Sequence, residues 1–170
     1  MKENNTKKIA ITAMMAAIAV VGSTFSFPIF GSKCAPVQHM VNVLCAVFLG
    51  PWYGLAAAFV ASVIRNLLGL GTLLAFPGSM CGALLSGLLD RKFQTLPAAY
   101  LGEVFGTAVI GGILAFPVAR LVMGNAGAAL FTFVVPFLVS TAGGTVIAAV
   151  LTGIMKGTGV MATLKTQLAE

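Results

Sequence analysis

The sequence predicts an all-α integral membrane protein, built as one bundle of six transmembrane helices with both termini in the cytoplasm. Only 8% of the 170 residues are charged, and the mean hydropathy is +1.03. The charged residues fall between long apolar runs, and a spanning helix needs about 20 mainly apolar residues. The six runs cover residues 9–27, 37–49, 52–68, 72–89, 98–119 and 130–155.

The connections between these runs are only a few residues long, which is too short to bury a core of their own. We therefore predict a single membrane domain over residues 1–170. The first run is too long for the core of a secretory signal, and no convincing cleavage site follows it. We expect it to be retained as the first helix.

The basic residues predict the orientation, because short cytoplasmic loops are enriched in Lys and Arg. With the N-terminus inside, seven basic residues face the cytoplasm, namely Lys2, Lys7, Lys8, Arg91, Lys92, Lys156 and Lys165. The three that face outside are Lys33, Arg65 and Arg120. The run 37–49 is short enough to be re-entrant, but a five-span arrangement would carry four of the seven inner residues outside. Six spans are therefore favoured.

Several function classes find no support in the sequence. The net charge is +6, yet the basic residues flank spans and form no patch with interleaved aromatics, so no nucleic-acid partner is expected. Three cysteines without C-x-x-C spacing and a lone histidine predict no metal site, and we expect no cofactor. No hydrolase or nucleotide-binding motif is present, so we predict that the protein is not an enzyme.

Small residues spaced four apart predict where helices touch, because close backbone approach supplies much of the packing energy in lipid. Three such stripes are expected to be interior seams: Gly54, Ala58 and Ser62; Gly78, Gly82 and Ser86; and Gly102 with Gly106. The first helix carries Ala13 and Ala17 on a smooth face. This face suits either packing within the bundle or docking of a separate membrane partner.

Polar side chains are costly inside a bilayer, about 2.5–3.5 kcal/mol for an Arg at its centre, so their positions point to a site. They converge near the outer ends of the second, third and fourth helices. We predict a small-molecule site there, formed by Gln38, His39, Asn42, Arg65, Asn66, Phe76 and Ser79. Phe25, Phe27 and Phe30 would add apolar walls, and Pro77 is expected to kink the fourth helix. An interfacial aromatic belt with snorkelling Arg side chains is the alternative for four residues, Phe25, Phe27, Arg65 and Arg120.

Glu103 is the only acidic residue predicted to lie within a span. The predicted topology places it toward the cytoplasmic end, away from His39. Three roles stay open: pairing with Arg91 or Lys92, lining an inner cavity, or reaching the ligand if the fifth helix is shifted.

Four segments together resemble the hydroxyethylthiazole-type substrate-binding (S) component of energy-coupling-factor vitamin transporters. They are residues 36–42, 49–53, 65–72 and 75–80, with the sequences PVQHMVN, LGPWY, RNLLGLGT and AFPGSM. The resemblance implies a multi-pass protein of the cell membrane that captures the thiazole precursor of thiamin from outside with high affinity. The ligand site would lie under the loop 31–36. Relatives that bind whole thiamin stack it on tryptophans, whereas the single Trp here, Trp52, falls near the cytoplasmic end, which fits a smaller ligand.

The resemblance also implies partners. A transmembrane coupling protein and two cytoplasmic ATPases would power uptake, and Ala13 with Ala17 would match the family's A-x-x-x-A coupling motif. Two alternatives stay open. The chain could be an S component for another small vitamin or heterocycle, or an ion-coupled secondary transporter.

Overall fold

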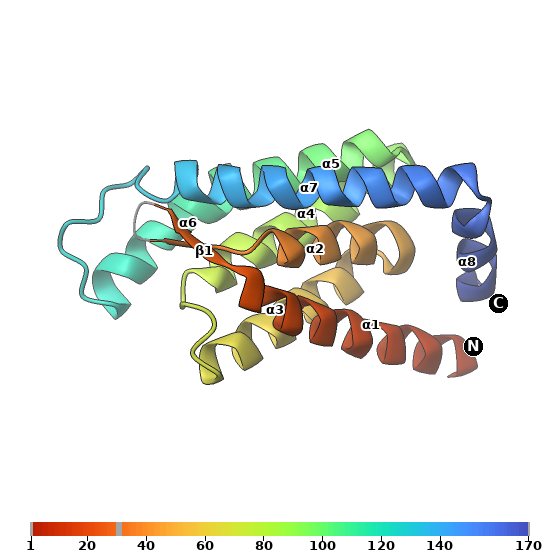
Figure 1. Cartoon of the computed structure of the whole chain (residues 1–170), viewed down its shortest axis with the longest axis horizontal. Helices are drawn as coiled ribbons and strands as arrows, with labels where there is room; N and C mark the ends of the chain where they lie inside the picture. The colour runs from red at the N-terminus through yellow and green to blue at the C-terminus, as the bar shows by residue number, and fades with distance from the viewer. Residues whose placement is uncertain (1, 30–31, 170) are drawn as a thin grey trace.

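The computed structural model describes the backbone of residues 2–29 and 32–169. The described chain is almost entirely helical, which confirms the predicted all-α class (Figure 1). The six principal helices are α1 (Lys2–Gly22), α2 (Pro36–Leu49), α3 (Pro51–Leu67), α4 (Ala75–Phe93), α5 (Leu96–Phe105) and α7 (Val134–Gly157). The helix α5 continues as one rod through η2 (Gly106–Gly111), α6 (Gly112–Pro117) and η3 (Val118–Val122), of which η2 and η3 are π-helical.

Local sequence explains where these helices begin and end. Proline stands in the first turn of α2, α3 and α5, where its fixed φ suits the helix and its missing N–H costs no hydrogen bond. Gly50 joins α2 to α3 with φ +88°, a conformation that other residues rarely adopt. Gln94, with φ 53°, ends α4 in the left-handed region.

The helices α2 and α4 form the interior of the bundle. The helix α2 packs against α1, α3, α4 and α7, and α4 packs against α3, α5 and η2. Where these helices meet, the predicted small-residue seams are confirmed. A Cβ atom added at Gly102 would lie 2.6 Å from Cα of Ser86, and one at Gly106 would lie 2.6 Å from the Cys81 carbonyl oxygen.

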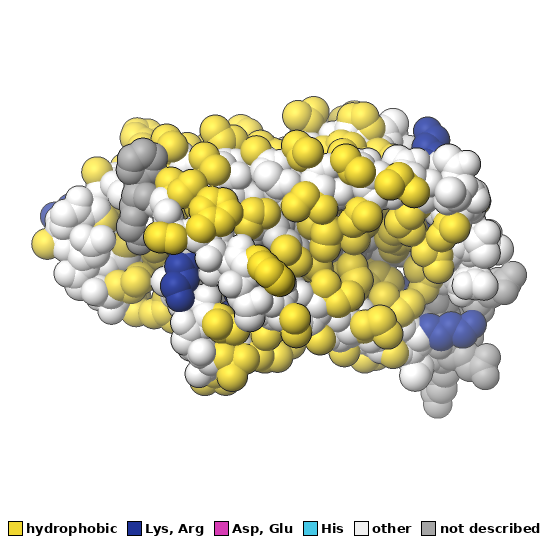
Figure 2. All heavy atoms as spheres, in the orientation of Figure 1, with side chains coloured by type: hydrophobic (Ala, Val, Ile, Leu, Met, Phe, Trp, Pro, Cys, Tyr) yellow, Lys and Arg dark blue, Asp and Glu magenta, His cyan; other side chains and the backbone are white. Residues whose placement is uncertain are grey.

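In the described part of the chain, three helices are long and apolar enough to cross a membrane by length and composition. They are Asn5–Phe25, Leu96–Val122 and Val134–Gly157, and Pro36–Leu49 is a shorter apolar helix. The side of the molecule drawn in Figure 2 is mostly hydrophobic, and its few basic side chains lie toward the two ends. Both ends of the chain lie at the same end of the bundle (Figure 1). The count of six spans stays a prediction.

The structure differs from the predicted elements at both ends of the bundle. Residues 23–34 do not simply link two spans: α1 ends at Gly22, η1 (Ser23–Phe25) follows, and β1 (Phe27–Ile29) pairs antiparallel with β2 (Ser32–Cys34). The chain also adds α8 (Val160–Ala169), which lies across the opposite end and packs against α1, α2 and α7. Neither element is apolar over the length of a span, so hydropathy gave no signal for them.

The helix α4 begins three residues after Thr72, the predicted start of the fourth span, and this removes the physical basis for a kink at Pro77. Residues 68–74 form turns, with Gly69 at φ +70°, and α4 begins at Ala75. Pro77 therefore lies in the first turn of α4, where a helix has no internal partner for the backbone N–H. Without a lost hydrogen bond in the helix interior, the proline has no reason to bend α4.

Candidate functional site

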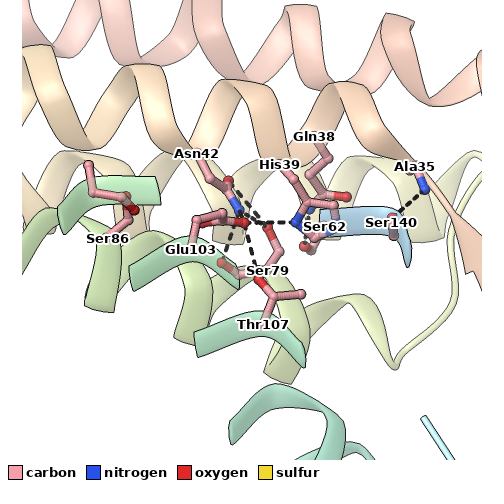
Figure 3. A network of polar contacts seen from close by, with 11 residues as sticks. Ala35, Gln38, His39, Asn42, Ser62, Ser79, Ser86, Glu103, Thr107 and Ser140 are labelled. Atoms are coloured by element: carbon pink, nitrogen blue, oxygen red, sulfur yellow. Dashed lines mark hydrogen bonds and ion pairs between the residues drawn. The ribbon is translucent and has the colours of Figure 1, made fainter. Parts of the chain in front are cut away.

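Five polar side chains meet between α2, α4, α5 and η2, and we call them the polar cluster. They are His39 and Asn42 from α2, Ser79 from α4, Glu103 from α5 and Thr107 from η2 (Figure 3). All five are buried, with Glu103 fully inaccessible to solvent. A buried polar network of this kind is stable only when its donors and acceptors are matched.

Glu103 is the centre of the polar cluster. Its Oε1 accepts hydrogen bonds from Nδ1 of His39 at 2.8 Å, Nδ2 of Asn42 at 3.0 Å and Oγ1 of Thr107 at 3.1 Å. Three donors converging on one oxygen suit an ionised carboxylate, which can only accept. With Nδ1 of His39 donating to Glu103, its Nε2 is the ring nitrogen left to meet a ligand.

Asn42 connects Glu103 to α4. Its Nδ2 also donates to the carbonyl oxygen of Ser79 at 3.2 Å and to Oγ of Ser79 at 3.0 Å, and that hydroxyl in turn lies 3.3 Å from Oδ1 of Asn42. The side-chain amide of Asn42 is therefore used within the protein. Its part in the site is to hold α2, α4 and α5 in register.

Two glycines provide room for the polar cluster. A Cβ atom at Gly82 would lie 2.8 Å from both carboxylate oxygens of Glu103 and closer still to Oγ1 of Thr107. A Cβ atom at Gly144 on α7 would lie 2.6 Å from Cβ of His39 and would meet the carbonyl oxygen of Pro36. The absence of side chains at these two positions lets α4 and α7 approach the polar residues closely.

A small cavity of about 30 Å³ lies beside the polar cluster, toward the end of the bundle that carries the β-hairpin. We call it the hairpin cavity. It is lined by polar side chains from six segments and by a few apolar residues. The polar ones are Ser32, Lys33, Gln38, His39, Arg65, Thr72, Ser79 and Thr107, and the others are Leu74, Phe137, Ala35, Ala75 and Gly78. Convergent polar groups with an apolar wall are the usual constitution of a small-molecule site.

Among the described residues, two basic side chains line the hairpin cavity and no acidic one does. Arg65, in the last turn of α3, is only 2% exposed, and its Nε has no hydrogen-bond partner among the described residues. Lys33 of β2 is exposed, and its Nζ donates to the carbonyl oxygen of Gly69 at 3.0 Å, which ties the hairpin to the turn after α3. The cavity is therefore positively charged on this side.

The structure divides the seven predicted site residues into two groups. Gln38, His39, Arg65 and Ser79 line the hairpin cavity, and Asn42 supports it from within the polar cluster. Asn66 and Phe76 lie outside the cavity wall. The wall that sequence reasoning missed is Phe137 of α7, which packs against Phe133 and lies close to Gly78.

Asn66 and Phe76 have other partners. Nδ2 of Asn66 donates to the carbonyl oxygen of Ser62, one turn earlier in α3, at 2.8 Å and to that of Thr72 in the α3–α4 turn at 3.1 Å. Phe76 packs against the exposed Phe59, with ring centroids 5.9 Å apart. Among the predicted loop aromatics, Phe25 is 77% exposed and Phe27 is 45% exposed, and Phe30 lies outside the described residues.

The expectation that His39 and Glu103 lie at different depths is wrong. The prediction placed the start of α2 at the outer surface, whereas α2 begins well inside the bundle. Its preceding residue, Ala35, donates its N–H to Oγ of Ser140 at 2.9 Å, and Ser140 is six residues along α7, about 9 Å from its start. His39 therefore lies beside the middle of α7, level with Glu103.

Pairing of Glu103 with Arg91 or Lys92 is also excluded by this position. The ion pair that the described residues form is His39 with Glu103. Thr107 joins the same carboxylate one helical turn along, and this i,i+4 spacing was the available sequence signal for its role. No group of three or more metal-ligating side chains occurs among the described residues.

The face of α1 that carries Ala13 and Ala17 points away from the bundle. Both residues are exposed, whereas Ala16 and Ala19 are 2% and 1% exposed and pack in the core with α2 and α3. Of the two interpretations that the sequence left open, packing within the bundle belongs to Ala16 and Ala19. The face with Ala13 and Ala17 is available to a neighbour in the membrane.

A protein-family model described as thiamine-precursor transporter protein (ThiW) matches residues 9–158. The match covers the polar cluster and the hairpin cavity and ends before α8. Comparisons with curated proteins and with solved structures give no match.

Proposed function

Because the chain belongs to the ThiW family of thiamine-precursor transporter proteins, we propose that it captures hydroxyethyl-methylthiazole, the thiazole precursor of thiamin, at the outer face of the cell membrane. The observation that carries this proposal is the hairpin cavity, where polar groups of β2, α2, α3, the α3–α4 turn, α4 and η2 meet an apolar wall. The ring would lie between Phe137 and the polar cluster. Gln38, His39, Arg65 and Ser79 would contact the ligand, and Asn42 and Glu103 would position them.

We propose six membrane crossings with both termini in the cytoplasm. The two termini lie at one end of the bundle (Figure 1), which requires an even number of crossings if the helices cross in turn. The hairpin end then faces outward, and the seven basic residues of the opposite end face the cytoplasm. The short helix α2 is accommodated because its outer end lies under the hairpin and within the protein.

The hairpin cavity must widen to hold a thiazole. Its volume of about 30 Å³ accommodates one or two water molecules, whereas ligand pockets have volumes of about 300–1,000 Å³. Two of its lining residues belong to the β-hairpin, which is joined to the α3–α4 turn through the hydrogen bond from Lys33. Outward displacement of this hairpin is the simplest way to admit a ligand.

The detergent-purified protein alone is expected to bind hydroxyethyl-methylthiazole with nanomolar to low-micromolar affinity. A ligand of about nine heavy atoms can gain at most about 1.5 kcal/mol per atom, roughly 13 kcal/mol in all, so this range is physically attainable. Equilibrium binding measured by calorimetry, with thiamin and riboflavin as comparison ligands, tests the expectation. Absence of thiazole binding by a protein with an intact thermal unfolding transition would overturn the ligand assignment.

We also propose that uptake is powered by partners, namely a transmembrane coupling protein and two cytoplasmic ATPases. The sequence carries no phosphate-cradling motif of its own. The exposed Ala13 and Ala17 suit close approach of a partner helix, since small side chains let backbones pack tightly in lipid.

Replacing both Ala13 and Ala17 with tryptophan is expected to reduce thiazole uptake by cells at least tenfold while leaving binding by the purified protein unchanged. The two bulky side chains would project outward from α1 and block a partner helix. Val146→Trp, at a 63% exposed position of α7, is the control for a bulky lipid-facing residue. Unchanged uptake by the double variant, expressed to the wild-type level, would argue against docking at this face.

One observation favours a second candidate, a proton-coupled secondary transporter. Such a protein needs a membrane-embedded relay, and His39 lies 2.8 Å from Glu103 in the bundle interior. Uptake that persists without the ATPases and is abolished by an uncoupler would support this candidate. Uptake that requires ATP hydrolysis and withstands the uncoupler would exclude it.

A further inference from the structure

We infer that the hairpin cavity holds the side arm of the thiazole against Arg65, and that a thiazole whose arm ends in an anionic oxygen group binds more tightly than the neutral alcohol. The inference rests on the proposed function. It names the chemical class of ligand, a carboxylate or a phosphate ester, that the charges of this cavity favour.

Arg65 is buried and forms no ion pair with the other described residues. Its side chain is buried, its Nε lacks a hydrogen-bond partner among the described residues, and the ion pair formed within the described chain belongs to His39 and Glu103. Among the described residues, the buried guanidinium of Arg65 therefore has no acidic counter-ion.

Burial of the Arg65 guanidinium without an anionic partner costs free energy. Burying a charge without a partner is strongly unfavourable, and buried charges in proteins are normally paired with an opposite charge. Guanidinium presents five N–H donors in a rigid fork, which matches the oxygens of a carboxylate or phosphate. Because Arg65 lines the hairpin cavity, a ligand anion in that cavity is placed to supply the missing partner.

The charged side chains around the hairpin cavity favour an anionic ligand group near Arg65. Lys33 lines the same cavity as Arg65, and none of the Asp or Glu residues that the structure describes does. The nearest described carboxylate in the site, Glu103, binds His39, Asn42 and Thr107 through Oε1 and is not part of the cavity wall. The ligand therefore meets positive charge at Arg65 and Lys33 and the side chains of the polar cluster at the other side, which orients its anionic arm toward Arg65.

Calorimetric titration of the full-length protein in detergent tests the inference. The probes are hydroxyethyl-methylthiazole, its phosphate ester, the analogue whose arm ends in a carboxylate, and inorganic phosphate alone. The wild-type protein is expected to bind at least one of the two anionic thiazoles at least tenfold more tightly than the alcohol. The two anionic probes distinguish phosphate from carboxylate as the preferred group. Inorganic phosphate is expected to bind far more weakly than either anionic thiazole.

Arg65→Gln is expected to abolish the preference for the anionic thiazoles, and Arg65→Lys to retain part of it. Arg120→Gln is the matched control, because Arg120 is an exposed arginine that lies over the ring of Phe116 and does not line the cavity. It should keep the full preference. If Arg65→Gln fails to fold, the wild-type titrations and the Arg65→Lys variant decide the question.

The outcomes separate the inference from the proposed function. Equal affinity of the wild-type protein for the alcohol and both anions, or a preference that survives Arg65→Gln, would overturn the inference while the thiazole assignment stands. Binding of inorganic phosphate as tight as that of the thiazole phosphate would mean a general anion site and would also overturn it. Failure of every thiazole to bind the folded protein would reject the proposed function itself.

Discussion

Glu103→Ala is expected to lower the free energy of unfolding by about 3–5 kcal/mol and to abolish thiazole binding. Removing a buried carboxylate leaves the groups that were bonded to it desolvated and unsatisfied, which costs about 1–3 kcal/mol for each donor. Here the substitution would leave three donors, on His39, Asn42 and Thr107, without their acceptor. It would also release the imidazole ring that lines the hairpin cavity.

Thermal unfolding in detergent and calorimetric binding measure the two effects of the Glu103 substitution separately. Glu103→Gln is the matched variant, since its amide oxygen can still accept from His39 and Asn42 while the charge is lost. We expect a smaller loss of stability for Glu103→Gln than for Glu103→Ala, together with weaker thiazole binding. A Glu103→Ala protein that unfolds at the wild-type temperature and binds normally would show that the polar cluster has no such role.

Gly144→Val is expected to destabilise the protein by about 3 kcal/mol, the upper end of the range for overpacking a core. The added Cβ atom would lie 2.6 Å from Cβ of His39 and 3.0 Å from the backbone N of Met40, besides meeting the carbonyl oxygen of Pro36. Two of these three atoms belong to the backbone of α2, so no side-chain rotation relieves the contact. The helix α2 must move away from α7, which would separate His39 from Glu103.

Gly153→Val on the same helix is the control for the Gly144 variant. Gly153 is exposed, and a Cβ atom there would meet nothing within 4 Å. Valine also has a better helix propensity than glycine, so Gly153→Val should be neutral or slightly stabilising. Thermal unfolding midpoints and thiazole titrations of both variants test the expectation. Equal behaviour of the two would mean that α2 and α7 do not need this close approach.

Hydropathy and residue spacing in the sequence were enough to predict the six principal helices and the contacts that their small residues make. Helical segments depend on local apolar runs, and the close contacts of Gly102 and Gly106 with α4 depend on i,i+4 spacing within one helix. The family match over residues 9–158 agrees with the resemblance read from four short segments. The β-hairpin and α8 were missed because neither carries an apolar run of spanning length.

The site was only partly predictable. Polar side chains in an apolar chain pointed to the right region, and Gln38, His39, Arg65 and Ser79 do line one cavity. Asn66 and Phe76 have partners within the protein that compete with a ligand for their side chains. The amide of Asn66 donates to the carbonyl oxygens of Ser62 and Thr72, and the ring of Phe76 packs against that of Phe59. Composition and residue spacing do not show whether a side chain already has a partner within the protein.

The sequence by itself determined that the chain lies in lipid, where its main helices run and which polar side chains could form a site. These properties follow from local hydropathy and from periodicity along one chain. Only the tertiary structure decided which of those residues meet. His39 and Glu103 are 64 positions apart, and their contact depends on the axial offset between α2 and α5. That offset follows from the start of α2 beneath the hairpin, where Ala35 bonds to Ser140 of α7, 105 positions away. Relative depth between helices is a property of long-range packing, and no local pattern in the sequence encodes it.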